Sequence, residues 1–196
     1  MLAIVDSGGA NIASVRFALE RLGVRSELTA DPTVIRAAER VILPGVGSAA
    51  EGMKRLRARG LVDCVRGLTQ PVLGVCLGLQ LLFESSAEGP TETLGLIPGR
   101  VTLLPDSPGI QVPHMGWNTV LTDKPVALLD GIAPEARFYF VHSYAGPVNE
   151  FTLASCDHGM PFAAVVQRGN FSGVQFHPER SGAAGARLLQ NFLTLA

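Results

Sequence analysis

The first half of the chain alternates short apolar runs with segments of helical periodicity, and this alternation constrains the fold most strongly. Four short runs are interpreted as strands, three of them without a polar side chain. After the first run, apolar residues recur at three- and four-residue spacing, as Ile12, Val15, Leu19 and Leu22 do. Strands that alternate with helices predict an α/β fold in three layers, with a mainly parallel central sheet and helices on both faces. The predicted strands are Leu2–Val5, Val24–Leu28, Val41–Leu43 and Val72–Val75.

The second half changes to short β-type runs that are separated by turn residues. We expect these runs to form antiparallel pairs added to the parallel core, and Ser181–Leu195 to close the chain as an amphipathic helix. No linker, repeat or low-complexity tract divides the sequence, so residues 1–196 are predicted to form one domain. The predicted runs are Val101–Leu104, Thr119–Leu121, Phe138–Val141, Phe151–Ser155, Ala163–Gln167 and Phe171–Phe176.

Composition excludes several classes of function. A formal net charge of −1 gives no electrostatic reason to bind nucleic acid or a membrane surface. The longest apolar segment, Pro71–Phe83, is too short to span a bilayer, and the N-terminus lacks the basic region of a signal peptide. Three widely spaced cysteines form neither a disulfide framework nor a metal motif, so we expect a cytoplasmic protein without a metal or other cofactor. Only 17% of the residues are charged, which predicts an apolar face for a partner.

One cysteine, Cys76, stands in the sequence Gly-Val-Cys-Leu-Gly where the fourth predicted strand passes into a helix. Glycines two residues before and after it have the spacing of a nucleophile elbow, a sharp turn with no room for neighbouring side chains. A helix N-terminus favours a thiolate, and the backbone N–H of Leu77 would become an oxyanion donor. The alternative is that Cys76 is a small buried hydrophobe, as free cysteines usually are. The pattern favours a nucleophile.

A nucleophilic thiol needs a base, and His177 is the candidate because Glu179 follows two residues later. Residues i and i+2 of an extended segment point to the same side, so the acid can orient the imidazole while the other ring nitrogen faces the thiol. The alternative is an ordinary surface turn. Of the other histidines, His142 and His114 could line the same cleft, whereas His158 is expected to be exposed in a polar turn.

The segment Pro44–Ser48 follows the third predicted strand and is the candidate for a second oxyanion element. Its two glycines, Gly45 and Gly47, let backbone N–H groups approach a ligand closely or rotate. The alternative is a plain strand-to-helix loop capped by Ser48. A phosphate-binding P-loop is excluded, because no Gly-Lys-Ser/Thr follows.

These segments resemble the class I (triad) glutamine amidotransferases. The elbow and the downstream His-Pro-Glu match that family in its chain order. The resemblance implies that Cys76 attacks the side-chain amide of glutamine and releases ammonia, with His177 as base and then acid, and Glu179 orienting it. Water would then hydrolyse the thioester to glutamate. The resemblance also implies that the oxyanion is held by the N–H groups of Val46, Gly47 and Leu77, and the ends of glutamine by Gly45, Gln80, Ser143 and Tyr144.

Further segments narrow the resemblance to the glutaminase subunits that serve histidine biosynthesis. They are Gly8–Asn11, Leu43–Gly47, Pro113–Asn118 and Tyr139–Tyr144. This branch implies a heterodimer with a (β/α)8-barrel cyclase subunit that uses the ammonia. The expected interface residues are Asn11, Met115, Trp117, Asn118, Tyr139 and Arg180. Many relatives carry Lys where this chain has Arg180, and Lys and Arg are not interchangeable at a tight contact.

Several alternatives stay open at this point. Trp117 could be a core aromatic, and Gln80 a polar residue on a helix surface. The whole chain could be another triad glutaminase, such as the one serving pyridoxal phosphate synthesis, or a non-catalytic amidotransferase-like scaffold. A cysteine peptidase or a peroxide-sensing thiol protein fits the order of the triad less well. The rotatable glycines predict an enzyme that is weak alone and switched on by its partner.

Overall fold

The computed structural model describes residues 1–8, 12–106 and 108–195. A seven-stranded sheet runs through the molecule in the order β11-β12-β13-β4-β3-β1-β2. Its parallel part consists of β1 (Leu2–Val5), β2 (Ser26–Thr29), β3 (Arg40–Leu43), β4 (Val72–Val75) and β13 (Phe171–Val174). Two antiparallel strands extend it on the β13 side, β12 (Pro161–Arg168) and β11 (Thr152–Asp157).

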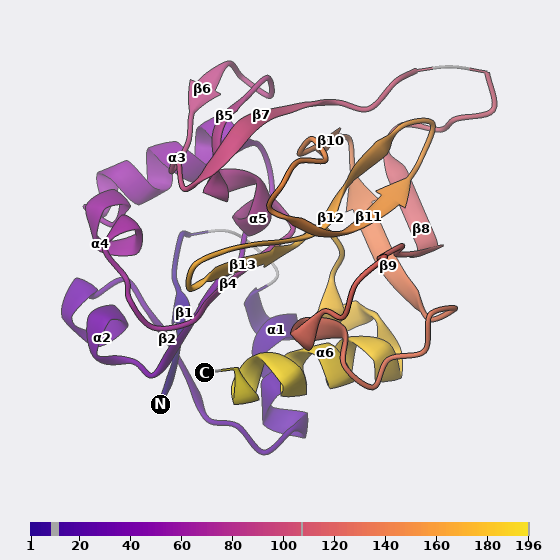
Figure 1. Cartoon of the computed structure of the whole chain (residues 1–196). Helices are drawn as coiled ribbons and strands as arrows, with labels where there is room; N and C mark the ends of the chain where they lie inside the picture. The colour runs from indigo at the N-terminus through magenta and orange to yellow at the C-terminus, as the bar shows by residue number, and fades with distance from the viewer. Residues whose placement is uncertain (9–11, 107, 196) are drawn as a thin grey trace.

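Helices cover both faces of this sheet, as Figure 1 shows. On one face lie α1 (Ile12–Arg21) and α6 (Gly182–Thr194). On the other lie α2 (Pro32–Ala37), α3 (Ala49–Ala58), α4 (Val62–Arg66) and α5 (Leu77–Leu82). Strand β1 shows why its sequence is wholly apolar: Leu2 and Ile4 join the core cluster of α1 and α6, whereas Ala3 and Val5 join the cluster on the opposite face. The predicted three-layer fold class is confirmed.

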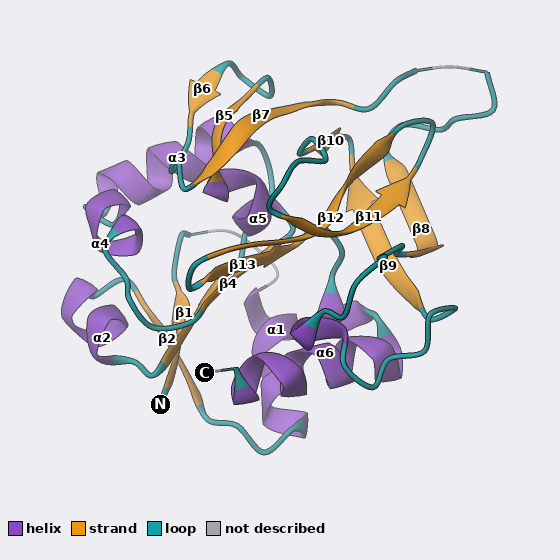
Figure 2. Cartoon of the chain, in the orientation of Figure 1, coloured by secondary structure: helices purple, strands orange, loops and turns teal. Residues whose placement is uncertain are grey.

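The second half adds strands outside the parallel core (Figure 2). β8 (His114–Thr119) pairs antiparallel with β9 (Arg137–His142), and a further sheet has the order β10-β7-β5-β6. The strands of that sheet are β5 (Phe83–Ser86), β6 (Thr91–Glu92), β7 (Ile97–Leu103) and β10 (Tyr144–Ala145). Two short 3-10 helices accompany α6. The helix η2 (Pro178–Arg180) directly precedes α6 in the sequence, and η1 (Ala127–Leu129) packs against α6.

The structure corrects two predicted strands of the second half. The strand predicted over Thr119–Leu121 is wrong, because β8 ends at Thr119 and Leu121 forms only an isolated bridge to Ser155. Backbone pairing with β9 sets the true extent of β8, although Gly116 interrupts its apolar pattern. The run Phe171–Phe176 was expected to be antiparallel, but β13 is antiparallel to β12 and parallel to β4.

The second strand of the chain begins later than predicted. The predicted range starts at Val24, whereas β2 starts at Ser26, where its pairing with Leu2 of β1 begins. Val24 packs instead against the core cluster that includes α1. Its side chain therefore serves the packing of the turn between helix and strand.

Candidate active site

Two neighbouring parallel strands meet at the site. β4 and β13 are paired in register up to Val75 and Val174, so the residues that follow both strands leave the same edge of the sheet. Cys76 follows β4 directly, and His177 comes three residues after the end of β13. The carboxyl edge of a parallel sheet is where α/β proteins commonly place ligands.

The backbone at Cys76 has the sharp turn that the glycine spacing predicts. Cys76 has φ 53° and ψ −109°, and it is the sole non-glycine residue with positive φ in the part of the chain that the structure describes. Such a conformation costs on the order of 1–3 kcal/mol and persists only where the surroundings impose it. A Cβ on Gly74 would lie 2.7 Å from the carbonyl of Gly78, and one on Gly78 would overlap the carbonyl oxygen of Leu43. The crowding therefore requires glycine at both positions.

His177 is held between a carboxylate and the thiol. Its Nδ1 lies 2.8 Å from Oε1 of Glu179, and the two side chains are only 6% and 1% exposed. Burial alone would lower the pKa of His177, but hydrogen bonds with Cys76 and Glu179 outweigh it and raise the pKa to about 10. The raised pKa favours an imidazolium at His177, directly beside the sulfur of Cys76, which is the kind of neighbour that an activated cysteine requires.

The sulfur of Cys76 faces a cavity of about 310 Å³. Sγ lies 3.9 Å from the carbonyl oxygen of Val141 and 3.8 Å from Nε2 of Gln175. The structure brings most of the predicted site residues to the wall of this cavity. The lining consists of Val46, Gly47, Cys76, Leu77, Gln80, Glu88, Val141, His142, Ser143, Tyr144, His177 and Arg180.

Two predicted residues lie behind this wall. Gly45 and Glu179 line a small adjacent space with Ile12 and Val15. A Cβ on Gly45 would lie 2.9 Å from Cβ of Leu77, so the loop passes tightly against the start of α5. Gly47, in contrast, has φ +88°, and among the described residues other than its two chain neighbours no heavy atom lies within 4 Å of the position that a Cβ would occupy. Only glycine adopts this conformation readily, and the space around Gly47 leaves its peptide room to turn.

Gln80 is buried and its amide is fully oriented. Its Nε2 donates to the carbonyl oxygen of Tyr144 at 2.7 Å and to Oε1 of Gln175 at 3.1 Å. The alternative of a glutamine on a helix surface is therefore wrong, because all of α5 packs into the core. Both N–H groups are used, so the amide oxygen is the atom that Gln80 can offer to a ligand.

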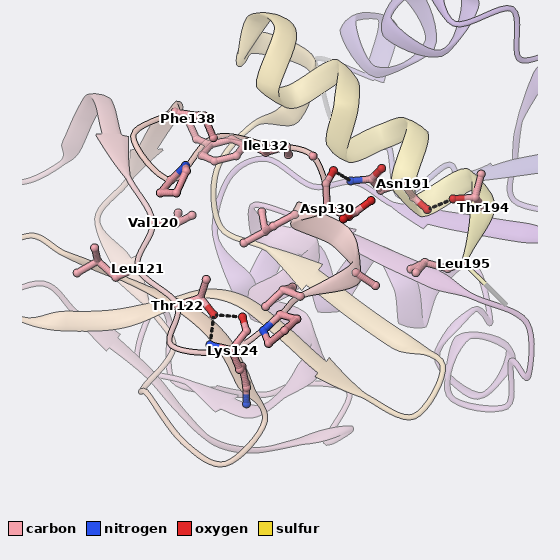
Figure 3. A pocket seen from close by; sticks show the side chains of 18 residues that line it. Val120, Leu121, Thr122, Lys124, Asp130, Ile132, Phe138, Asn191, Thr194 and Leu195 are labelled. Atoms are coloured by element: carbon pink, nitrogen blue, oxygen red, sulfur yellow. Dashed lines mark hydrogen bonds between the residues drawn. The ribbon is translucent and has the colours of Figure 1, made fainter.

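A larger cavity of about 880 Å³ lies elsewhere, between η1, the segment after β8 and the end of α6 (Figure 3). Most of its walls are apolar, with Val120, Ile132, Phe138 and Leu195 among them. None of the candidate catalytic residues lines it. Size alone would favour this cavity as the active site, but the candidate catalytic residues Cys76 and His177 line the smaller one.

A family model described as glutamine amidotransferase class-I matches residues 3–196. The chain belongs to this family. The resemblance predicted from the elbow and the His-Pro-Glu segment is thereby confirmed. The match spans almost the whole chain, including the added strands of the second half.

Two curated relatives of high identity carry the same name. The imidazole glycerol phosphate synthase subunit HisH of Xanthomonas axonopodis pv. citri (strain 306) is 55% identical over 195 residues, which cover 100% of this chain and 98% of the relative. The HisH subunit of Vibrio cholerae serotype O1 is 50% identical over 200 residues, with coverage of 99% and 98%. A solved structure described as a glutamine amidotransferase superposes with a TM-score of 0.74 at 22% identity, covering 97% of this chain and 96% of that one, which supports the fold.

The predicted interface residues that the structure describes lie in or against β8 and β9. Trp117 is 51% exposed and Met115 is 60% exposed, so the alternative of a core tryptophan is wrong. Trp117 packs edge-on against Tyr139, and the guanidinium of Arg180 lies 4.4 Å from the centre of the Tyr139 ring. Asn118 is half-buried. Asn11 lies outside the described residues.

Sequence reasoning missed three residues of the amidotransferase site. The carbonyl of Val141 and the amide of Gln175 lie beside the thiol, and Glu88 lines the cavity. Only Gln175 carries a sequence signal that could have found it. It is the polar residue in the apolar run Gly173–Phe176, two residues before His177 and therefore on the same side of the extended chain.

Proposed function

We propose that the chain is the glutaminase subunit of an imidazole glycerol phosphate synthase. It hydrolyses glutamine to glutamate and ammonia, and the ammonia serves histidine biosynthesis. The observation that carries this assignment is the 55% identity, over the whole chain, to a relative named HisH. The geometry around Cys76 supplies a site for that chemistry.

The hydrolysis proceeds through a thioester on Cys76. The thiolate attacks the side-chain carbonyl carbon of glutamine, and the carbonyl oxygen takes the negative charge. The imidazolium of His177 gives its proton to the nitrogen, the C–N bond breaks, and ammonia leaves. Neutral His177 then removes a proton from water, which attacks the thioester. Glutamate departs as the C–S bond breaks, and Cys76 and His177 return to their starting forms.

The remaining residues bind and orient. Glu179 holds Nδ1 of His177 at 2.8 Å, so Nε2 is the nitrogen free to exchange the proton with the thiol. Backbone N–H groups of Leu77 and of Val46–Gly47 are proposed to hold the oxyanion. The ends of glutamine are proposed to lie against Gly45, Gln80, Ser143 and Tyr144, most of which line the cavity.

A partner subunit follows from the assignment, because HisH relatives are subunits of a synthase. We propose that the partner is a (β/α)8-barrel cyclase that uses the ammonia to make imidazole glycerol phosphate and an aminoimidazole carboxamide ribotide. The exposed Met115 and Trp117 suit the centre of such a heterodimer interface, since tryptophan is enriched at binding hot spots. Tyr139 and Arg180 adjoin them, and Asn11 and Asn118 complete the proposed set.

The proposed setting is a single domain in the cytoplasm. Within the described ranges, no helix is long and apolar enough to cross a bilayer. The cysteines Cys64, Cys76 and Cys156 are all free and buried, which suits a reducing compartment. No nucleic acid or membrane partner is proposed for a chain of net charge −1.

Labelling tests the nucleophile. A diazoketone analogue of glutamine is expected to modify Cys76 alone, as read by peptide mass spectrometry. Cys156 is the internal control, because burial raises the pKa of that thiol to about 12. Cys76→Ala is expected to lose glutaminase activity, and retained activity would overturn the mechanism.

Reconstitution tests the partner. Glutamate release is measured with and without the cyclase and its ligand. A rise on adding the cyclase is expected, because the open space at Gly47 allows an oxyanion donor to be turned away until the partner binds. Equal rates would refute the switch. Purification of the chain with a different synthase would point instead to another triad glutaminase.

A further inference from the structure

Gln175 is a fully buried polar side chain that the mechanism above does not use. It is 0% exposed and stands directly after β13, where its backbone N–H donates to Ala164 at 2.9 Å. Burying an amide is costly unless its groups are hydrogen-bonded. The partners of this side chain therefore show what it does.

The partners of Gln175 fix the orientation of its amide. The chain of contacts begins at the carbonyl oxygen of Tyr144, which can only accept. Nε2 of Gln80 must therefore point at that carbonyl, and its second N–H reaches Oε1 of Gln175 at 3.1 Å. With its oxygen facing Gln80, Gln175 must turn its own N–H groups the other way, where Sγ of Cys76 lies 3.8 Å from Nε2.

We propose that Gln175 is a further residue of the glutaminase reaction, which holds the Cys76 sulfur through its amide N–H and holds Gln80 through its amide oxygen. This inference rests on the proposed function. The donor suits a thiolate, which accepts hydrogen bonds and has none to donate. The sulfur thus has the His177 ring and the Gln175 amide as donors, and the carbonyl oxygen of Val141 lies 3.9 Å away as a third contact.

The second half of the role concerns the substrate. Gln175 accepts one N–H of Gln80 and Tyr144 accepts the other, so only the oxygen of Gln80 is left to meet a ligand. An acceptor at this place suits the ammonium end of an amino acid. Gln175 therefore links the position of the nucleophile to the position of a substrate-binding group, without touching the substrate's ends itself.

Two variants separate this role from simple packing. Gln175→Met keeps the length of the side chain and removes both polar groups, whereas Gln175→Glu keeps the shape and cannot donate when ionised. The matched control is Gln167→Met, on an exposed part of β12. Each protein is studied with its synthase partner present.

The decisive readout is the pH profile of Cys76 alkylation by iodoacetamide, followed by peptide mass spectrometry. The other titratable groups around the thiol are His177, Glu179, His142, Glu88 and Tyr144, with Arg180 also on the cavity wall. All of them are unchanged in the variants, but Gln175→Glu adds a carboxyl beside the thiol, so Gln175→Met carries the comparison. In Gln175→Met the profile is expected to move to higher pH by about one unit, because a hydrogen bond to the thiolate is lost. The value of kcat/KM for glutamine is expected to fall about 10- to 100-fold.

Packing alone would leave the alkylation profile in place. A profile like that of the wild type in Gln175→Met overturns the proposal, even if the melting temperature falls. If Gln175→Met fails to fold, Gln175→Leu takes its place, because leucine also removes both polar groups and adds no charge beside the thiol. Failure here is distinct from failure of the proposed function, in which the wild-type chain itself would neither hydrolyse glutamine nor react with its diazoketone analogue.

Discussion

Two buried histidines line the same cavity and behave in opposite ways. His177 and His142 are 5% and 7% exposed. Burial lowers the pKa of each, yet hydrogen bonds with Cys76 and Glu179 raise the pKa of His177 to about 10, whereas that of His142 falls to about 3. Equal burial thus gives a cation in one place and a neutral ring in the other.

The partners of His142 explain the difference. Its Nδ1 donates to the carbonyl oxygen of Tyr144 at 2.9 Å, so its Nε2 accepts from Nδ1 of His114 at 3.1 Å. Nε2 of His114 in turn faces the side-chain amide of Asn118 at 3.4 Å. A proton added to either ring would set two N–H groups against each other. His177, beside a carboxylate, is therefore the histidine suited to carry a proton. His142 belongs to an uncharged hydrogen-bonded series, Tyr144–His142–His114–Asn118, which we call the neutral histidine series and which stabilises the structure.

Removing the carboxylate should make His177 resemble His142. In Glu179→Gln the ring loses the group that fixes its tautomer and stabilises its charge, and kcat/KM for glutamine is expected to fall about 10³- to 10⁴-fold. Glutamate release measures the loss. Glu27→Gln, an exposed change on β2, is the control. A loss of less than tenfold would show that Glu179 has no such role.

The same variant tests the charge directly. By NMR, the ring of His177 is expected to titrate near pH 10 in the wild type and at distinctly lower pH in Glu179→Gln. The direction follows because burial, the largest influence, lowers the pKa of His177, and without the carboxylate only Cys76 is left to raise it. An unchanged titration would assign the raised pKa to Cys76 alone.

Local sequence patterns predicted the role of His177 but not the hydrogen bonds that join His142 to His114. The elbow glycines, the pair His177 and Glu179, and the strands β1, β3 and β4 all follow from residues close together in sequence. The contact between His114 and His142 joins residues 28 apart, and that between Gln80 and Gln175 joins residues 95 apart. The first pair depends on the register of β8 and β9 and the second on how α5 packs against β13, and the sequence shows neither. The extent of β8 was missed for the same reason.

The neutral histidine series should make the stability of the fold sensitive to acid. His142→Phe keeps a ring in place but removes two hydrogen bonds, so the free energy of unfolding at pH 7 is expected to fall by about 1–3 kcal/mol. Urea unfolding measures this value.

The sign of the pH effect in the wild type is set by depressed pKa values. His142 and His114 have pKa values of about 3 and about 4 when folded, against about 6.5 when unfolded. Between pH 6.5 and 4 the unfolded chain binds protons that the native chain refuses, so stability is present above pH 6.5 and is lost as pH falls. The slope should be shallower in His142→Phe by about one proton. Equal slopes of the free energy of unfolding against pH in the wild type and in His142→Phe would contradict the claim that His142 stays uncharged in the folded protein.

The smallest effect is expected at His158, at the outer end of the histidine group. Its ring stacks on His114 with centroids 4.1 Å apart, and its Nε2 donates to the carbonyl oxygen of Gln111 at 2.7 Å. Burial is the main reason for the low pKa of His114, and the charge of His158 adds to it. In His158→Gln the pKa of His114, followed by NMR, should therefore rise slightly and stay well below 6.5. If His114 titrated near pH 6.5 in this variant, repulsion from His158 rather than burial would be the main cause of the low pKa of His114.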